Sequence, residues 1–533
     1  MSALPPVPAL AAVDAVAVSV AVEAVDAANV DALGFAVYTE GDVPAELGLD
    51  REALKRAGFE AKAGSTLVLP QADGPDLVAV GAGVEAEVDA TALRDLAAAF
   101  TRATARRARI ALRVGSIGSA DAAAAVRALT EGALLARYAY TALKSAPKHV
   151  GLEAVTFVLD GVDAAGSAEA DEAIIAARIS ARAAVIARDL ANTPPDRLTA
   201  TGMGDIAVVL GERFGFGVEL FDKAALTELG CGGLLGVNQG SAEEPRMIKL
   251  TYRPTGESAG HLGLVGKGIM YDSGGISLKP SDPMHLLMKM DMGGAAAVLG
   301  AFTGLRDSGA EASVTGWLMC TDNMPSGTAY KLGDVLVARN GTTVEVKNTD
   351  AEGRLVMMDA IALANEDGVD AIIDIATLTG AAVMSLGQST APVLGNDQRM
   401  VDLTLAASAA TDEPLWQLPL EKKYRPQLDS DIADISNLGG RYAGATTAAL
   451  FLAHFAGKTP WAHLDIAGTM QTDNDDSWRS KGATGFGARL LLGRGQRRQL
   501  GVQRIAAGDQ RLDGIRPGLL QQRPALRCGL LAA

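Results

Sequence analysis

The sequence predicts an α/β protein of two domains, a smaller N-terminal α/β domain and a larger C-terminal domain whose mixed sheet is flanked by helices. The chain has 533 residues, which exceeds the usual size of one domain. Only 4% of the residues are aromatic and glycine is abundant, a composition that suits helices packed on a buried sheet. Strands, glycine-rich turns and helices also alternate along most of the chain, which is the pattern of a sheet covered by helices.

The N-terminal domain is predicted at residues 1–165. Residues 76–80 form a short apolar run typical of a strand, and residues 89–107 have helical spacing. Residues 81–86, Gly-Ala-Gly-Val-Glu-Ala, fit the glycine pattern of a dinucleotide-binding turn, but Glu85 would lie unfavourably close to a pyrophosphate. We therefore predict an ordinary strand-to-helix turn there.

A linker helix and joint are predicted at residues 166–196. Residues 166–170 are small and polar, and a long helix is expected over residues 169–190. It must end at Asn192-Thr193-Pro194-Pro195, because paired prolines cannot continue a helix. The larger domain follows at residues 197–492, with strands expected at residues 262–265, 312–318, 344–346, 371–375 and 462–466.

The last segment, residues 493–533, differs from the rest in charge. It contains arginines but no lysine, opposed only by Asp509 and Asp513, whereas the preceding chain is acidic. The abrupt change indicates a shifted reading frame or an appended extension, and we expect a poorly ordered tail. An arm for RNA or an acidic partner is the alternative, which the lack of lysines and aromatics disfavours.

Composition and charge exclude several classes of protein. The net charge of −15 argues against a general nucleic-acid binder, because phosphate contacts need a basic face. Three scattered cysteines are too few for a disulfide framework, which indicates a reducing compartment. No Lys or Arg precedes Arg51, and the apolar run at residues 13–25 is too short to span a bilayer. We expect a cytoplasmic protein that does not enter membranes.

The first chemically informative segment is residues 266–275. An apolar strand runs into this glycine-rich loop, which holds Lys267 and Asp272, and Lys279 and Asp291 follow it. Glycines allow the backbone to approach a bound group closely. A lysine beside glycines can bind phosphate, but Lys267 is followed by Gly268 and not by the Ser or Thr of a P-loop.

The second segment is residues 348–355, Asn-Thr-Asp-Ala-Glu-Gly-Arg-Leu. Asp350 and Glu352 alone could be a helix cap and an acid in the first helical turn. Taken with the first segment, however, they bring four acids and two lysines to the ends of predicted strands, where α/β folds place ligand sites.

Four clustered carboxylates repel one another unless cations neutralise them, and four exceed what a single catalytic zinc needs. A site with two divalent metals follows. The five histidines include no His-Glu-x-x-His, and no Gly-x-Ser-x-Gly stands at a strand–helix junction, so neither a single-zinc protease nor a serine hydrolase is supported. His463 lies in an apolar run and is predicted to be a satisfied core histidine.

The motifs together resemble those of the leucyl aminopeptidase family. Residues 348–355 are similar to its signature octapeptide, and the likeness covers residues 170–492 well and the N-terminal domain loosely. The other matching segments are residues 192–195, 266–268, 272–275, 279–280, 291–296, 323–327 and 377–381.

The resemblance implies a metal ligand set. One metal would be held by the residues matching Lys267, Asp272, Asp291 and Glu352, and the other by those matching Asp272, Asp350 and Glu352. A lysine ligand must lose its proton, and two nearby cations would lower its pKa enough for this.

The resemblance also implies the remaining roles. Lys279 would stabilise the oxyanion of the tetrahedral intermediate, and Arg354 would hold a bicarbonate that takes the proton from the metal-bridging water. Met288, Thr377, Leu378 and Gly380 would line the substrate cleft, although core packing is an equal alternative for Met288 and Leu378. A homo-hexamer is also implied.

We therefore expect a two-metal aminopeptidase with Mn²⁺ or Zn²⁺ that removes leucine and other apolar residues from peptide substrates. Another two-metal hydrolase, such as a phosphoesterase, is the alternative within enzymes, because Lys279 and Arg354 could serve a phosphate. Some relatives of the family bind DNA as regulators, but the acidity of this chain makes nucleic-acid binding the weaker alternative.

Overall fold

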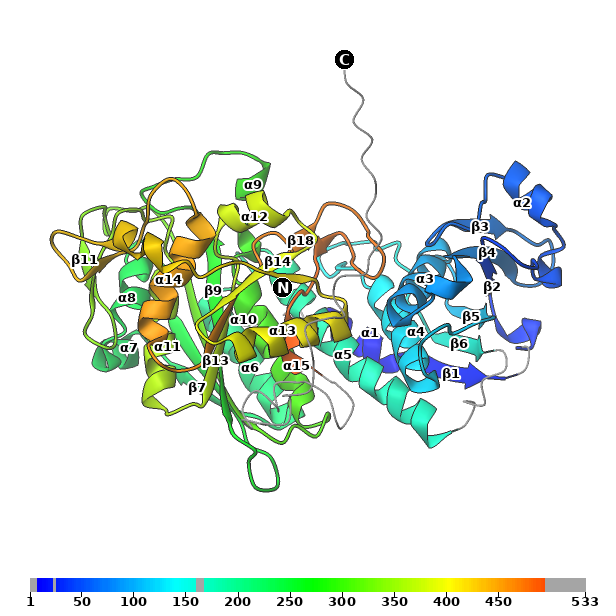
Figure 1. The fold of residues 1–533 in the computed structure, drawn as a ribbon, viewed down its shortest axis with the longest axis horizontal. Coiled ribbons are helices and arrows are strands. Elements are labelled where there is room, and N and C mark those ends of the chain that lie inside the picture. Colours follow the sequence, from blue (N-terminus) through cyan, green and yellow to red (C-terminus); the bar gives the residue numbers. More distant parts are fainter. Residues whose placement is uncertain (1–6, 23–24, 160–166, 494–533) are drawn as a thin grey trace, which may run out of the picture.

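The computed structural model describes residues 7–22, 25–159 and 167–493. These residues form two α/β units, each built on its own sheet, with the long helix α5 between them (Figure 1). The predicted fold class is confirmed. The predicted tail, residues 493–533, lies outside the described residues apart from Gly493.

The N-terminal unit contains a six-stranded sheet in the order β1-β6-β5-β2-β4-β3, in which only β3 is antiparallel to its neighbour. Its helices and strands are α1 (Pro8–Ala15), β1 (Ala17–Ala21), β2 (Ala32–Tyr38), α2 (Arg51–Arg56), β3 (Thr66–Leu69), β4 (Asp76–Gly83), α3 (Ala90–Ala103), β5 (Arg109–Val114), α4 (Ala122–Ala136) and β6 (Ala154–Leu159).

The glycine-rich turn predicted after residue 80 is wrong in position. Strand β4 continues through Gly81 to Gly83, and a short 3₁₀ turn, Glu85–Glu87, precedes α3. A Cβ on Gly81 would lie 2.1 Å from the carbonyl oxygen of Lys62, so this glycine permits close packing of two backbones. Gly81 is therefore needed for the close approach of two backbones and not for a turn, and the local sequence does not distinguish these two uses.

Helix α5 (Ala168–Asn192) begins with the side chain of Ser167 accepting a hydrogen bond from the Ala170 N–H, and ends immediately before Thr193 and the two prolines, as predicted. Its buried residues contribute to the cores of both units. The buried Arg188 guanidinium donates to the carbonyls of Leu135 in one unit and of Thr484 and Trp478 in the other.

A buried ionic cluster also joins the units. Glu131 of α4 accepts hydrogen bonds from Arg94 Nε at 3.0 Å and from Arg489 of α15 at 2.7 Å. Arg127 lies on the same carboxylate, also at 3.0 Å. The three guanidinium groups hold the pKa of Glu131 well below its usual value although burial alone would raise it.

The C-terminal unit contains an eight-stranded mixed sheet in the order β15-β14-β17-β13-β9-β10-β8-β7. Its helices are α6 (Ala200–Phe214), α7 (Lys223–Leu229), α8 (Gly232–Asn238), α9 (Pro283–Leu286), α10 (Gly293–Leu305), α11 (Gly353–Glu366), α12 (Gly380–Leu386), α13 (Gln398–Thr411), α14 (Gly444–Ala456) and α15 (Ala488–Leu492). The strands of this sheet are β7 (Gly217–Phe221), β8 (Arg246–Tyr252), β9 (His261–Asp272), β10 (Ser313–Asn323), β13 (Ala371–Ala376), β14 (Ala391–Gly395), β15 (Leu415–Gln417) and β17 (Trp461–Asp465).

Smaller elements complete the unit: β11 (Val335–Val337), β12 (Thr343–Glu345), β16 (Ile435–Ser436), β18 (Gln471–Thr472), β19 (Gly482–Ala483) and the 3₁₀ segments η4 (Leu287–Met290) and η5 (Lys422–Leu428). One face of the main sheet packs on α5, α6, α10 and α15, and the other packs on α8, α11 and α14. The five predicted strands all occur, as β9, β10, β12, β13 and β17. The predicted boundaries at residues 165, 196 and 492 remain predictions.

One boundary error bears on the site. The glycine-rich loop predicted to begin at residue 266 is part of β9, which runs to Asp272. A Cβ on Gly266 would lie 2.7 Å from the Ala295 Cα of α10, so this glycine lets a helix lie close against the strand. Lys267 is consequently held within a buried central strand.

The segment Pro283–Leu305 has the length and hydropathy of a candidate membrane span, and 78% of its apolar 18-residue window is buried inside the protein. It comprises α9, η4 and α10, and α10 packs on α5 and on the sheet. Its apolar character is therefore accounted for by packing within the core.

Candidate metal centre

Four neighbouring strands, β17, β13, β9 and β10, run parallel, so their carboxyl ends meet at one edge of the sheet. Asp465, Asp272 and Asn323 are the last residues of β17, β9 and β10, and Thr377 directly follows β13. This edge is where open α/β sheets place their ligand sites, and here it gathers acidic and amide side chains.

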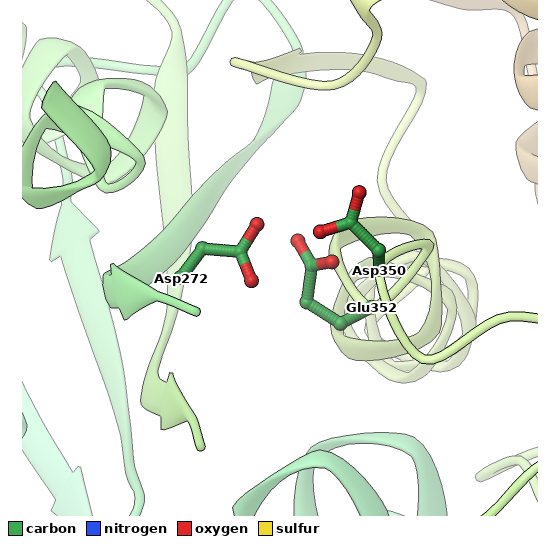
Figure 2. A group of neighbouring side chains, drawn as sticks. All are labelled: Asp272, Asp350 and Glu352. Carbon is green, nitrogen blue, oxygen red and sulfur yellow. The ribbon is translucent and has the colours of Figure 1, made fainter. Parts of the chain in front are cut away.

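Three carboxylates converge at this edge. Asp272 comes from β9, whereas Asp350 and Glu352 come from the turn that leads into α11, and Figure 2 shows their carboxylates directed toward one another. One oxygen from each of the three lies within 4.8 Å of the others. Asp272 and Glu352 are each 2% exposed, whereas Asp350 is half-buried.

Lys267 joins the fourth acid to this cluster. Its Nζ lies 2.8 Å from Asp291 Oδ2 and 2.9 Å from Glu352 Oε1, and it donates to the carbonyl of Thr377. Burial alone would lower the pKa of the Lys267 ammonium, but the surrounding carboxylates raise it above its usual value. In this arrangement the lysine is an ammonium that neutralises part of the cluster.

Lys279 forms ion pairs with the other two acids. Its Nζ is 2.9 Å from Asp272 Oδ2 and 2.5 Å from Asp350 Oδ1, and its side chain is 20% exposed. Burial, with the negative charges of Asp272 and Glu352, raises the pKa of Asp350 to about 6. Lys279 is thus the more accessible of the two lysines.

Arg354 is in the first turn of α11 and is 6% exposed. Its Nε is buried and has no hydrogen-bond partner among the described residues. Burial lowers the pKa of its guanidinium to about 10, although the negative charges of Glu352 and Asp465 oppose the shift. The guanidinium is therefore a buried positive charge beside the acids.

The four residues expected to line the substrate cleft differ in their contacts and in their exposure. The Thr377 hydroxyl donates to Asp291 Oδ1 at 2.8 Å, which places Thr377 in the site. The backbone N–H of Leu378 donates to Asp465, and its side chain packs against the core on the α11 face. Gly380 is exposed with open space beside it, and Met288 is half-buried in η4.

Several site residues were missed by the sequence analysis. Asn323 donates from Nδ2 to Asp272 Oδ1 at 2.8 Å and to the Thr349 carbonyl, which fixes the orientation of Asp272. Asp465 accepts hydrogen bonds from the backbone of Leu378 and from Thr379, and so fixes the loop after β13. Residues 323–327 carried a family motif, but nothing local indicated that Asn323 contacts Asp272.

Gly353, which has no side chain, also shapes the site. Gly353 follows Glu352, and a Cβ there would lie 2.6 Å from Lys267 Cε and 2.8 Å from its Nζ. The glycine is thus required for Lys267 to reach Asp291 and Glu352.

The cluster fits divalent cations. Its four carboxylates are opposed by the ammonium groups of Lys267 and Lys279 and by the guanidinium of Arg354, so the site keeps an excess of negative charge that suits a cation. Glu352 Oε2 is buried and has no hydrogen-bond partner in the described part of the chain. Carboxylate oxygens are ligands for Mn²⁺, Mg²⁺ and Zn²⁺, so an unpartnered oxygen among clustered acids is suited to a metal.

Comparison with known families decides the class of this site. The model of the cytosol aminopeptidase family, catalytic domain, matches residues 185–492, and the model of its N-terminal domain matches residues 47–147. The chain belongs to the cytosol aminopeptidase family. It is accordingly a metal-dependent aminopeptidase, that is, a metallo-exopeptidase, and the resemblance to leucyl aminopeptidases is confirmed.

Individual relatives of this aminopeptidase agree. A probable cytosol aminopeptidase of Solibacter usitatus is 43% identical over 77% of this chain and 85% of its own length. One from Synechococcus sp. is 40% identical over 84% of this chain and 89% of its own. Among solved structures, the bottromycin maturation enzyme BotP in complex with Mn is 37% identical, with a TM-score of 0.79 over 87% of this chain and 98% of that one.

Proposed function

We propose that this aminopeptidase uses two divalent metal ions, Mn²⁺ or Zn²⁺, to remove N-terminal residues from peptides, with leucine and other apolar residues preferred. The observation that supports this most is the convergence of Asp272, Asp350 and Glu352, extended by Lys267 to Asp291. The bound manganese of BotP belongs to that protein and supports Mn²⁺ here only by analogy.

The proposed ligand sets follow the contacts in the cluster. Lys267, Asp272, Asp291 and Glu352 would hold one metal, and Asp272, Asp350 and Glu352 the other. Asp272 and Glu352 are the most buried acids of the cluster, which suits a bridging position between two cations. When bound, the metals supply Lewis-acid polarisation of the scissile carbonyl and lower the pKa of a water molecule.

The two lysines differ in what they can reach. The side chain of Lys267 is 3% exposed and that of Lys279 is 20% exposed. Lys279 is therefore the one that can donate to the carbonyl oxygen of a substrate and stabilise the negative charge that develops there. Lys267 lies too deep for this, within β9.

Arg354 would hold a bicarbonate ion, which supplies the proton acceptor for the reaction. Its buried guanidinium retains an unpartnered Nε, as expected of a group that binds an anion. Of the acids near it, Glu352 and Asp350 contact Lys267 and Lys279 and would hold the metals, and Asp465 accepts from the backbone of Leu378, so the role of proton acceptor is assigned to the anion.

Selection of the chain end would come from Asp291. The free amine of a peptide can pair with this buried carboxylate, which Thr377 and Lys267 orient. The first side chain of the substrate would occupy a cleft formed by Met288, Thr377, Leu378 and Gly380. A cytoplasmic location is proposed, in keeping with the family name, and a homo-hexamer is proposed from the family resemblance alone.

The test is hydrolysis of leucine p-nitroanilide before and after exhaustive chelation, with N-acetyl-leucine p-nitroanilide and bis(p-nitrophenyl) phosphate as matched substrates. We expect chelation to abolish activity, Mn²⁺ or Zn²⁺ to restore it, and both matched substrates to be resistant. Equal cleavage of the acetylated substrate would contradict an aminopeptidase, and preferred cleavage of the phosphate ester would establish the phosphoesterase alternative. A salt-dependent DNA shift at physiological ionic strength would contradict the prediction that nucleic acid is not a partner.

A further inference from the structure

His463 is a fully buried histidine close to the metal centre that the proposed mechanism does not use. It lies in β17, two residues before Asp465, and pairs in register with Asp374 of β13. Because side chains alternate along a strand, His463 lies on the same face of β17 as Trp461 and Asp465. Trp461 belongs to the core that α11 and α14 cover, so His463 lies on the side of the sheet that carries Arg354.

One ring nitrogen of His463 is firmly fixed. Its Nδ1 lies 2.5 Å from Asp374 Oδ1, and Trp461 Nε1 donates to Asp374 Oδ2, also at 2.5 Å. The Trp461 and His463 rings stack with an interplanar angle of 8°. An ionised carboxylate only accepts, so Nδ1 must carry a hydrogen, and the orientation of the imidazole ring is set.

The other ring nitrogen has no partner. His463 Nε2 and Arg354 Nε are both buried without a hydrogen bond among the described residues. The prediction of a satisfied core histidine therefore holds for one nitrogen only. Buried polar atoms are nearly always hydrogen-bonded, so two unpartnered nitrogens need an explanation.

The two side chains are also within electrostatic reach of one another. Burial lowers the pKa of His463, but the negative charges of Asp374 and Asp465 raise it, and the net shift is upward. The positive charge of Arg354 opposes this rise. Asp465 likewise acts on Arg354. His463, Asp465 and Arg354 are thus three buried groups whose charges act on one another.

We propose that His463 is a positioning residue for Arg354, and that the two side chains share one small oxygen-bearing molecule bound between His463 Nε2 and Arg354 Nε. An oxygen atom there accepts from the Arg354 Nε–H. The same oxygen can bond to His463 in either protonation state of the ring. If Nε2 is neutral, the hydroxyl of a water or a bicarbonate donates to it, and if Nε2 is protonated, the oxygen of either molecule accepts from it. Asp374 and Trp461 would fix the ring, and the ring would fix the guanidinium.

This inference rests on the proposed role of Arg354, and its chemistry fits two sources of the oxygen, a water molecule or bicarbonate. A misplacement of a catalytic group by about 1 Å can cost roughly 10²-fold in rate. Loss of the Nε2 contact should therefore lower kcat without removing metal or changing the fold.

A matched pair of variants separates the two nitrogens. In His463→Asn, the amide can replace Nδ1 and still donate to Asp374, but nothing replaces Nε2. In His463→Gln, the longer amide reaches the Nε2 position. We expect His463→Asn to lower kcat by roughly 10- to 100-fold, with KM and bound metal unchanged, and His463→Gln to recover most of the loss. The control is His149→Asn, an exposed histidine of the N-terminal unit, which should match the parent protein.

The decisive measurement is a double-mutant cycle with Arg354→Ala. If His463 acts through Arg354, the double variant Arg354→Ala/His463→Asn will have the kcat of Arg354→Ala alone, whereas additive losses would overturn the inference. Full activity of Arg354→Ala would instead refute the proposed role of Arg354 in the mechanism.

A crystal structure tests the inference independently of activity. It should show an ordered oxygen between His463 Nε2 and Arg354 Nε in the parent protein and none in His463→Asn, and a direct contact to another protein group at either nitrogen would refute the shared molecule. Crystals prepared with and without bicarbonate identify the source: a density present in both is water, and one present only with bicarbonate is the anion.

Discussion

Gly353 offers the sharpest test of how the site is built. Replacing it by alanine adds a single methyl group, which would lie 2.6 Å from Lys267 Cε and 2.8 Å from its Cδ and Nζ. Carbon atoms pack at about 3.5–4.0 Å, so the lysine side chain must retreat by roughly 1 Å. Its hydrogen bonds to Asp291 Oδ1 and to the Thr377 carbonyl, both 2.8 Å long, would then stretch beyond hydrogen-bond range.

The substitution has opposing effects on stability. Alanine is favoured over glycine in a helix by about 1 kcal/mol, and crowding a packed site costs about 1–3 kcal/mol. The melting temperature should therefore fall only slightly. The displacement of Lys267 should lower kcat by roughly 10²-fold and reduce bound metal.

The assay is hydrolysis of leucine p-nitroanilide in Mn²⁺, with metal content and thermal unfolding measured on the same preparations. The control is Gly202→Ala in α6, where the added methyl has no neighbour nearer than 3.8 Å, so activity should be unchanged and stability slightly higher. Parental kcat and metal content in Gly353→Ala would show that Lys267 need not occupy the position described, and the proposed ligand set would fall with it.

Three further predictions concern other residues. Lys279→Ala should lower kcat by roughly 10²–10³-fold while metal content, measured by mass spectrometry, is retained; loss of metal would make Lys279 part of the cation site instead. Glu131→Gln should lower the free energy of unfolding, measured by urea titration, by about 3–5 kcal/mol, because the buried Arg94 and Arg489 lose their counter-charge. A change as small as that of the exposed control Glu52→Gln would contradict this. Burial raises the pKa of the Asp359 carboxyl to about 7, so the folded protein holds the carboxyl proton more tightly than the unfolded chain does. The free energy of unfolding should therefore fall as the pH rises from about 4 to about 7. Asp359→Asn should lack that part of the slope in thermal unfolding, and an identical slope would show that Asp359 is ionised throughout.

The sequence predicted which acidic and basic side chains converge better than it predicted the local structure around them. Lys267, Asp272, Asp350 and Glu352 were recognisable because clustered acids with lysines have few explanations apart from cations. Their convergence also followed from the fold, since parallel strands present their carboxyl ends at one edge.

The errors share a physical cause. Glycines at positions 81 and 266 indicated turns, but both lie within strands, where the missing side chain admits a neighbouring backbone. Local sequence cannot distinguish the two uses of glycine, because the neighbour is far away along the chain. The contacts of Asn323 and His463 could not be foreseen for the same reason: their partners, Asp272 and Asp374, lie 51 and 89 residues away.

Helix α5 has a consequence for the evolution and handling of the protein. Ile186 and Leu190 on one side of it belong to the core of the C-terminal unit, and Ala181 and Val185 belong to that of the N-terminal unit. The match to the catalytic-domain family begins at residue 185, part-way along this helix. A fragment cut there would divide a continuous helix and expose the apolar residues that the other unit covers. We therefore expect the two units to melt in a single transition, and an exchange of either unit to require that this helix go with it.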